Sequence, residues 1–155
     1  ALDPDEYHIS LSRTVMLPQA QIEPFADALR VALRPCRAAA RVPLATRLCE
    51  LANDTQTRFF AAVEVERGTA GHATALTLVD AVDRVMARYG QPQFYAERRL
   101  HFSIAWAAAP LSIEQPEEAA ATPAPAHLPP SLAAVRVDTV LCRIGERTSS
   151  YRLAA

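Results

Sequence analysis

The sequence predicts an α+β protein with mostly antiparallel strand pairing. Two stretches, residues 20–34 and 72–89, carry apolar side chains at helical spacing, and the segments around them alternate apolar and polar residues as strands do. The expected order is strand, helix, strand, strand, helix, strand, connector and hairpin. At 155 residues, 50% of them hydrophobic, the chain is long enough for one compact domain with a real core.

The first strand and the first helix are expected close to the start of the chain. Residues 7–15 alternate as a strand, Pro18 lies near the start of the helix over residues 20–34, and Pro35 ends that helix. The apolar stripe of the helix, which is typical of a side packed on a core, consists of Ile22, Phe25, Ala26, Leu29 and Leu33.

The middle of the chain predicts two strands, a long helix and a third strand. Residues 46–52 and 58–66 read as strands joined by a polar turn. Residues 72–89 form the clearest helical pattern, and Gly90 is placed to end it. A loop over residues 92–99 then leads into the next strand.

The last third predicts a connector followed by a hairpin. Residues 108–130 are rich in Ala, Pro and Glu, which is typical of a flexible connector, with a short helix at residues 112–121. Residues 135–144 return to a strand pattern, residues 145–147 form a turn, and residues 149–153 pair back.

The composition limits the kinds of partner. The net charge is −1 and every basic residue is Arg, so any RNA contact has to be local. Four arginines form a basic patch that we interpret as a solvated face rather than a phosphate site: Arg30, Arg34, Arg37 and Arg41. No apolar run approaches the roughly 20 residues of a membrane span, and the first residues lack the layout of a signal peptide. The three cysteines, Cys36, Cys49 and Cys142, lack metal-type spacing and indicate reduced thiols of an intracellular protein.

One short pattern, a His followed by an apolar residue, a Ser and another apolar residue, occurs twice. In a strand, alternate side chains share a face, so His8 lies beside Ser10, and His101 beside Ser103. A single His on a strand is more often structural or simply exposed. Two such faces meeting across a groove would form a minimal acid–base pair, each imidazole beside a hydroxyl.

These motifs resemble those of the 2H phosphoesterases and, within that superfamily, the U6 small nuclear RNA phosphodiesterases. Residues 8–12 resemble the first family motif, residues 82–86 the second long helix, and residues 94–106 the second motif with its preceding Phe-Tyr pair. The closing hairpin is matched by Cys142, Arg143, Gly145, Arg147 and Ser150. The matching stretches follow the family's order and cover nearly the whole chain.

The resemblance implies a two-lobed fold in which antiparallel sheets face a central groove and helices pack outside. Residues 1–155 are then expected to be a single 2H phosphoesterase-like domain. Family members usually carry a further strand and helix before the first motif, whereas this chain begins seven residues ahead of His8. We therefore expect one lobe to lack an edge strand.

The resemblance also implies an activity. The family trims the 3′ end of U6 small nuclear RNA as a metal-independent 3′–5′ exonuclease, leaving a 2′,3′-cyclic phosphate that some members open to a 3′ phosphate. No cofactor is expected. The implied partner is the RNA 3′ end, with no membrane, and the chain is expected to be a nuclear monomer.

The resemblance assigns roles to five side chains. His101 is taken as the base that removes the ribose 2′-OH proton and His8 as the acid that protonates the leaving 5′-oxygen, although the sequence leaves the reverse assignment open. Ser10 and Ser103 would bind non-bridging phosphate oxygens. Tyr95 resembles the family's base-stacking tyrosine, and its alternative is a packed loop aromatic.

Four further residues have weaker assignments. Ser12 either supports His8 or borders the groove, and Ser150 is a candidate for the groove lining. Tyr7 is expected to pack on the apolar side, and Trp106 to be a core anchor behind the second motif.

Two alternative functions stay open. One is another 2H enzyme, acting on 2′,3′-cyclic phosphates or 2′-5′ linkages. The other is a catalytically inactive module that binds RNA or nucleotides. A metal-dependent hydrolase is disfavoured because no Asp, Glu and His cluster at ligand spacing appears, and a serine-nucleophile hydrolase because neither motif Ser lies on a glycine-flanked elbow.

Overall fold

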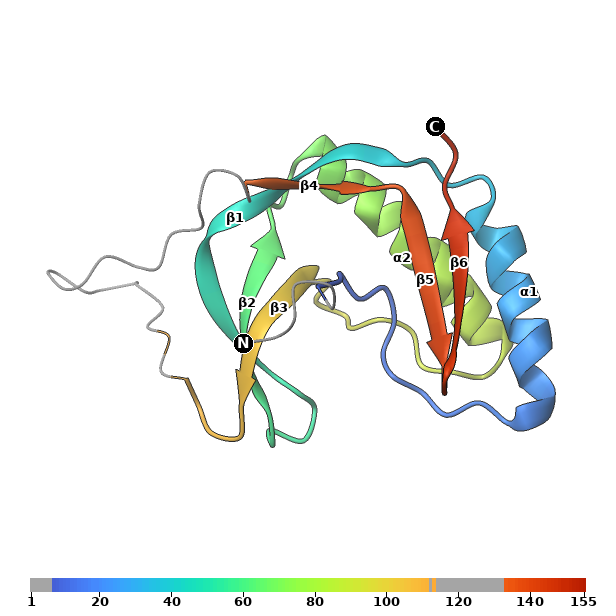
Figure 1. Ribbon diagram of the computed structural model, residues 1–155, viewed down its shortest axis with the longest axis horizontal. Coiled ribbons are helices and arrows are strands. Elements are labelled where there is room, and N and C mark those ends of the chain that lie inside the picture. Colours follow the sequence, from blue (N-terminus) through green and yellow to red (C-terminus); the bar gives the residue numbers. More distant parts are fainter. Residues whose placement is uncertain (1–6, 112, 114–132) are drawn as a thin grey trace, which may run out of the picture. The chain divides into compact units, whose positions relative to one another are not determined.

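The computed structural model describes residues 7–111, 113 and 133–155. It has α+β architecture, with antiparallel sheets and two α-helices, as the sequence predicts (Figure 1). The chain divides into two compact units: unit 1 comprises residues 1–10, 43–66 and 99–134, and unit 2 comprises residues 11–42, 67–98 and 135–155. Most of the expected connector, including its short helix, lies outside the described residues.

Unit 1 contains β2, β3 and most of β1, three strands of a sheet whose order is β3-β2-β1-β4 (Figure 1). The central strand β2 (Phe59–Val65) pairs antiparallel with both β1 (Ala39–Ala52) and β3 (His101–Ala107), while β4 (Ala134–Val137) lies on the other side of β1. One face of β2 and β3 is apolar because Val63 and Phe102, which pair directly, are both buried.

Strand β1 is longer than the sequence predicts, since it begins at Ala39 instead of residue 46. Pro43 lies inside β1. Because proline has no N–H to donate to a neighbouring strand, its presence in a sequence argues against a strand. Its carbonyl nevertheless accepts a hydrogen bond from the Glu66 amide at 2.9 Å. The register then shifts between Leu44 and Leu48, which breaks the alternation that the prediction depends on.

The expected first strand over residues 7–15 is wrong. Among the described residues this segment joins no sheet, and it bends at Leu11 and Ser12. Polar and apolar residues do alternate in this segment, but alternation alone does not provide a neighbouring strand with which the segment can pair. The segment is instead held in part by Tyr7, whose ring lies 5.8 Å from that of Phe102 on β3. The expected packing of Tyr7 is therefore found, although its side chain stays 40% exposed.

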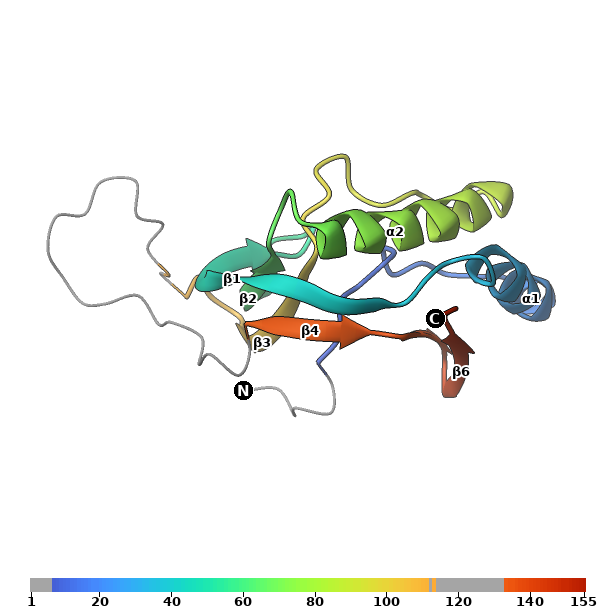
Figure 2. The same cartoon turned by 90° about the horizontal axis from the view of Figure 1, so that it is seen from above.

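Unit 2 packs two helices and a hairpin around one core (Figure 2). After a short 3-10 turn (Gln19–Gln21) come α1 (Ile22–Leu33) and α2 (Ala70–Arg88), and the hairpin consists of β5 (Thr139–Ile144) and β6 (Arg147–Arg152). The largest core side chains are Phe25, Leu29, Leu33, Leu78, Val82, Val85, Met86, Val140, Tyr151 and Leu153. None of the helices in the described residues is both long enough and apolar enough to cross a membrane.

The helix boundaries follow from the residues that flank them. Both helices lie within two residues of the predicted ranges. The Thr69 hydroxyl accepts the His72 amide at 3.1 Å and so caps the start of α2. Gly90 takes φ +67°, as a residue that ends a helix often does. The predicted strand over residues 135–144 is divided into β4 and β5 at Asp138, whose carbonyl accepts the Leu153 amide at 2.9 Å.

The core of unit 2 should make the protein sensitive to alkaline pH. Burial raises the pKa of the Cys36 and Cys142 thiols and of the Tyr151 hydroxyl. The folded state then keeps protons that the unfolded chain releases, so this stability is complete below the unfolded thiol pKa of 9.0 and is lost as pH rises through the raised values.

We therefore expect the melting temperature, measured by circular dichroism, to fall steadily above about pH 9. Cys142→Ala should make that fall shallower, whereas Val31→Ala, a truncation on the exposed face of α1, should not. A melting temperature that stays level or rises between pH 9 and pH 10.5 would contradict this predicted loss of stability at alkaline pH.

Candidate functional site

The second motif displays its polar side chains on one face of β3. Residues directly opposite each other in an antiparallel ladder share a face. His101 pairs with Glu64 and Ser103 with Ala62, while Phe102 between them is buried on the other side. Both His101 and Ser103 are half-buried, so they are held by the sheet and remain accessible.

The imidazole of His101 has a defined orientation. Its Nδ1 lies 2.8 Å from the backbone carbonyl oxygen of Arg99. A carbonyl can only accept a hydrogen bond, so Nδ1 carries the proton and Nε2 of the neutral ring keeps a lone pair that can take one. This is the tautomer that a general base requires.

The carbonyl that orients His101 is itself held across the sheet. The Arg99 Nε donates to the Glu64 carboxylate at 2.6 Å, and this pair is about three-quarters shielded from solvent, with 29% and 25% of the two side chains exposed. Glu64 lies directly opposite His101 on β2. The Glu64–Arg99 pair is therefore a support for the imidazole, and sequence reasoning missed it because the two residues lie 35 positions apart.

The first motif belongs to the same unit. His8 and Ser10 are exposed, and Ile9 between them is half-buried, which is the alternation that the sequence predicts. The Tyr7–Phe102 ring contact attaches this segment to β3 at a residue that lies between His101 and Ser103 in the sequence but on the opposite face of the strand. All four predicted His and Ser side chains of the two motifs therefore lie in unit 1.

Tyr95 lies in unit 2, on a loop that α2 fixes in place. Asp83, 4% exposed, accepts the Phe94 amide at 2.7 Å and the Arg98 guanidinium at 3.4 Å. The Tyr95 ring is 38% exposed, meets Phe94 edge-on at 5.4 Å and has the Arg13 guanidinium 4.0 Å from its centroid. An accessible aromatic ring held from several sides is suited to stacking on a base.

The two weaker candidates also lie in unit 2. Ser12 is half-buried at the bend that follows the first motif. Ser150 lies on β6 opposite Leu141, which is 64% exposed, while the next pair, Val140 with Tyr151, is buried. Ser150 is thus on the solvent side of the hairpin. Gly145, at φ +57°, lies in the turn between its strands, as predicted.

The expectation for Trp106 is wrong, because its side chain is 50% exposed and is no core anchor. By simple alternation Trp106 would share the buried face with Phe102. However, Ala61 pairs with Ala105 and Ala62 with Ser103, which inserts one extra residue into β3. This bulge moves Trp106, which pairs with Phe60, to the face that carries His101 and Ser103.

Within the described residues, no group of three or more His, Cys, Asp or Glu side chains is arranged to hold a metal ion. On β3, His101 offers an imidazole that can transfer a proton and Ser103 a hydroxyl that can donate a hydrogen bond to an anion.

Comparisons with known proteins agree on one family. The HVSL family model, described as "Uncharacterised conserved protein", matches residues 3–152. U6 snRNA phosphodiesterase 1 of Bos taurus is 40% identical over 106 residues, which is 66% of this chain and 37% of that protein. The Drosophila melanogaster protein of the same name is 34% identical over 68% of this chain and 40% of its own length. The chain thus spans less than half the length of these relatives.

The fold likeness extends further than the sequence likeness. The solved structure of Kluyveromyces marxianus Usb1 superposes with a TM-score of 0.64 at 17% identity, covering 95% of this chain and 74% of that one. A second structure of that protein, with uridine monophosphate, gives a TM-score of 0.63 at 16% identity, with the same coverage. The chain belongs to the HVSL family, and proteins named U6 snRNA phosphodiesterase 1 are among its relatives.

Proposed function

We propose that this chain is an RNA phosphodiesterase that shortens the 3′ oligouridine end of U6 small nuclear RNA without a metal ion. The observation that carries the proposal is the geometry of β3, where a half-buried imidazole with a defined tautomer shares a face with a serine hydroxyl. The relatives named U6 snRNA phosphodiesterase 1 supply the substrate class.

The proposed reaction is an internal transesterification. Nε2 of His101 takes the proton of the ribose 2′-OH, and the 2′-oxygen attacks the adjacent phosphorus. The bond from phosphorus to the 5′-oxygen of the last nucleotide breaks, and His8 donates a proton to that oxygen. The first step gives a 2′,3′-cyclic phosphate on the shortened RNA and a released nucleoside with a 5′-OH. In each later step the released nucleoside also carries the cyclic or open phosphate of the previous end. Water then opens some of the cyclic ends to a phosphate.

The serines and the tyrosine would bind the substrate. Ser10 and Ser103 donate hydrogen bonds to the non-bridging phosphate oxygens as negative charge builds up on them. Tyr95 stacks on the terminal base, a role consistent with the uridine monophosphate in the K. marxianus Usb1 structure. Ser12 is proposed to support His8 or to border the groove, and Ser150 to line the groove.

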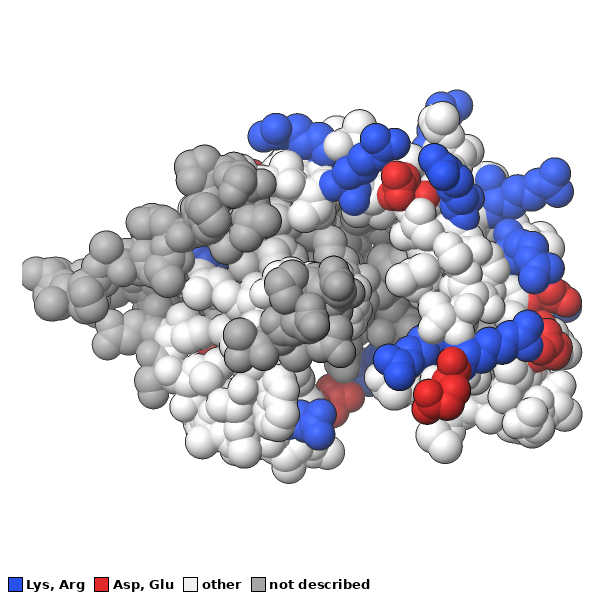
Figure 3. Space-filling model, in the orientation of Figure 1, with Lys and Arg blue, Asp and Glu red and all other residues white. Residues whose placement is uncertain are grey.

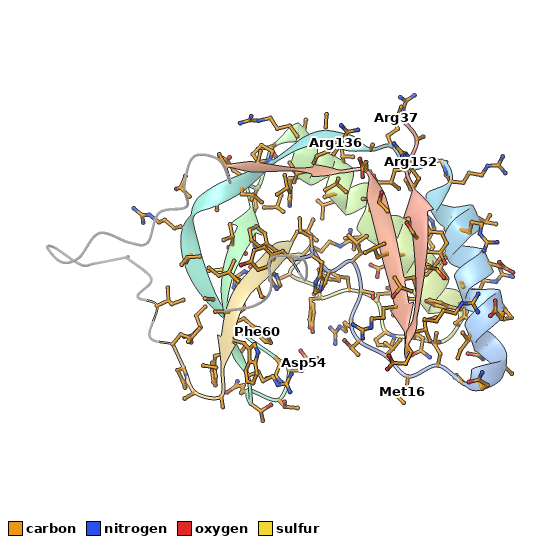
Figure 4. All side chains as sticks on the ribbon, viewed as in Figure 1. Met16, Arg37, Asp54, Phe60, Arg136 and Arg152 are labelled. Carbon is orange, nitrogen blue, oxygen red and sulfur yellow. The ribbon has the colours of Figure 1, made fainter. Side chains whose placement is uncertain are left out.

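The charge of the chain is segregated in a way that favours RNA binding. Unit 2 contains 13 of the 16 arginines and 7 of the 17 acidic residues, a net charge of +6, which the overall value of −1 conceals. Arginine side chains stand out on the face of unit 2 seen in Figure 3. Two of them, Arg37 and Arg152, are exposed near the end of β6, where Arg37 pairs with Ala154 (Figure 4). A net charge of this sign attracts the phosphates of RNA and makes the affinity depend on salt.

The remaining parts of the proposal concern organisation. We propose that residues 1–155 act as one 2H phosphoesterase-like domain, monomeric and nuclear. The family match over residues 3–152 supports one domain, and relatives named for a small nuclear RNA support the nucleus.

The test is one reaction in excess EDTA with a short RNA that ends in uridines, read by mass spectrometry. We expect stepwise 3′ shortening and a cyclic or open phosphate at each new end. The same RNA with a 2′-deoxy sugar before its last nucleotide is the control, and we expect it to stay intact. Cleavage of both RNAs would contradict attack by the 2′-oxygen. Cleavage of 2′-5′ dimers alone would indicate a different 2H enzyme, and binding without product an inactive module.

A further inference from the structure

We propose that Trp106, with Phe60 and Arg58, forms a second base-binding platform that holds a nucleotide of the RNA away from the scissile bond. This inference rests on the proposed function, because it assigns an additional subsite to the same substrate. It starts from the half-exposed indole on the sheet face that carries His101 and Ser103.

The backbone places Trp106 on this face by a specific device. A β-bulge adds one residue between the pairs Ala61–Ala105 and Ala62–Ser103. Without it, Trp106 would share the buried side with Phe102. Bulges next to active sites commonly redirect a side chain in this way. Single aromatic residues on a protein surface are common and need no explanation. A bulge that turns Trp106 to the same face as His101, the proposed base, does call for one.

The separation suits a polynucleotide. Ser103 and Trp106 pair with Ala62 and Phe60, which lie two positions apart on β2, and at ~3.3 Å per residue this gives about 7 Å along the sheet. A stacked single strand rises ~3.4 Å per nucleotide, so Trp106 lies about two stacked nucleotides from Ser103, the proposed phosphate site, and fewer if the RNA is extended.

The surroundings of Trp106 fit a nucleotide. The Arg58 guanidinium lies 5.0 Å from the indole centroid, and Phe60 is the direct cross-strand partner (labelled in Figure 4). A base stacks on the indole, and the guanidinium is placed to meet a phosphate or to cover the ring. An aromatic ring beside an arginine is the combination that binds single-stranded nucleic acid with little sequence preference.

Arg58 is also held in position. It follows a turn that the Asn53 side chain organises, because Asn53 Oδ1 accepts the amides of Thr57 at 2.9 Å and Arg58 at 3.0 Å. The Asn53 amide in turn donates to the hydroxyls of Thr55 and Thr57 at 3.0 Å each. The base of the Arg58 side chain is thus set before RNA arrives, which lowers the entropy cost of binding.

Intrinsic fluorescence tests the platform directly, because Trp106 is the only tryptophan of the chain. The full chain is titrated with a 2′-O-methyl oligouridine of six nucleotides, which lacks the attacking hydroxyl and cannot be cleaved by this route. We expect saturable quenching as a base stacks on the indole, and weaker quenching by the 2′-O-methyl dinucleotide. No quenching at hexanucleotide concentrations that saturate binding by anisotropy, or no binding at all, would overturn the proposal.

A variant series tests its contribution to turnover. Trp106→Ala should raise KM for a hexanucleotide about 5- to 100-fold with little change in kcat, and should raise KM for a dinucleotide far less. Trp106→Phe should recover part of the loss, since a benzene ring still stacks. Met16→Ala, which truncates an 89% exposed side chain in unit 2, is the matched control and should leave both KM values unchanged.

Abasic substitution identifies the nucleotide. A set of hexanucleotides, each lacking one base, is compared on the parent chain and on Trp106→Ala. The position whose abasic penalty disappears in the variant is the one stacked on Trp106. Equal penalties at every position would overturn the platform even in an active enzyme. If no RNA is cleaved, the proposed reaction fails, while quenching by the 2′-O-methyl hexanucleotide would still support the platform.

Discussion

Replacing either His101 or His8 by alanine is expected to lower the rate of RNA shortening by about 10²- to 10⁴-fold. Each imidazole is proposed to transfer one proton in the step that breaks the P–O bond, and alanine can transfer none. For His101 the structure adds a reason, because the Arg99 carbonyl holds Nδ1 and leaves Nε2 as the basic atom. His101→Gln should not restore activity, since an amide has no basic nitrogen.

The measurement is a single-turnover cleavage of an oligouridine RNA with saturating protein. His72→Ala is the matched control, because His72 lies in the first turn of α2 and outside both motifs. It should cleave at the parent rate, provided that its melting temperature is also unchanged. Near-parental rates for both His8→Ala and His101→Ala would contradict the two-histidine mechanism.

An activated leaving group separates the two roles. Uridine 3′-(4-nitrophenyl phosphate) releases a phenolate that needs no proton, so a variant lacking only the acid should regain most of its activity. We expect His8→Ala to be rescued on this substrate and His101→Ala to stay slow. The opposite result would mean that His8 is the base and His101 the acid.

The elements whose apolar residues recur at a regular spacing could be predicted from the sequence. Both helices lie within two residues of their predicted ranges, because an apolar stripe at helical spacing needs only one side to be buried. The hairpin was recognisable from its turn around Gly145. The shared face of His101 and Ser103 also follows from strand parity alone.

The errors occur where pairing between distant segments overrides the local pattern. Residues 7–15 alternate as a strand does, yet they join no sheet within the described part of the chain. Strand parity predicts Trp106 on the buried face of Phe102, and the bulge in β3 opposite Ala61 and Ala62 moves its side chain to the other face. The position of a bulge depends on the partner strand, so no pattern within residues 101–107 could reveal it.

The interactions that hold the site residues in place likewise could not be predicted from local sequence patterns. The Glu64–Arg99 pair and the Asp83–Phe94 hydrogen bond join residues that are 35 and 11 positions apart. One signal was available, because Asp83 is an acidic residue between Val82 and Val85, both buried in the helix stripe. A buried carboxylate needs a partner, so a position of this kind predicts an anchored loop.

Asp83→Ala should therefore destabilise the protein more than any other loop-directed change in unit 2. Asp83 is 4% exposed and accepts hydrogen bonds from the Phe94 amide and the Arg98 guanidinium. Removing the buried carboxylate leaves the half-buried Phe94 amide without its acceptor, whereas Arg98, whose side chain is 37% exposed, keeps its pair with Asp80. Such losses cost about 3 kcal/mol, which for a chain of this size lowers the melting temperature by about 6–12 °C.

Asp80→Ala is the matched control, because Asp80 pairs with the same Arg98 at 2.5 Å but is 48% exposed. Exposed pairs contribute about 0–1 kcal/mol, so this variant should melt within about 4 °C of the parent. Asp83→Asn should fall between the two, since its amide oxygen can still accept the Phe94 N–H. Because Asp83 holds the loop that presents Tyr95, Asp83→Ala should also weaken RNA binding below its melting temperature. Equal melting temperatures for Asp83→Ala and Asp80→Ala would show that the loop is anchored by other contacts.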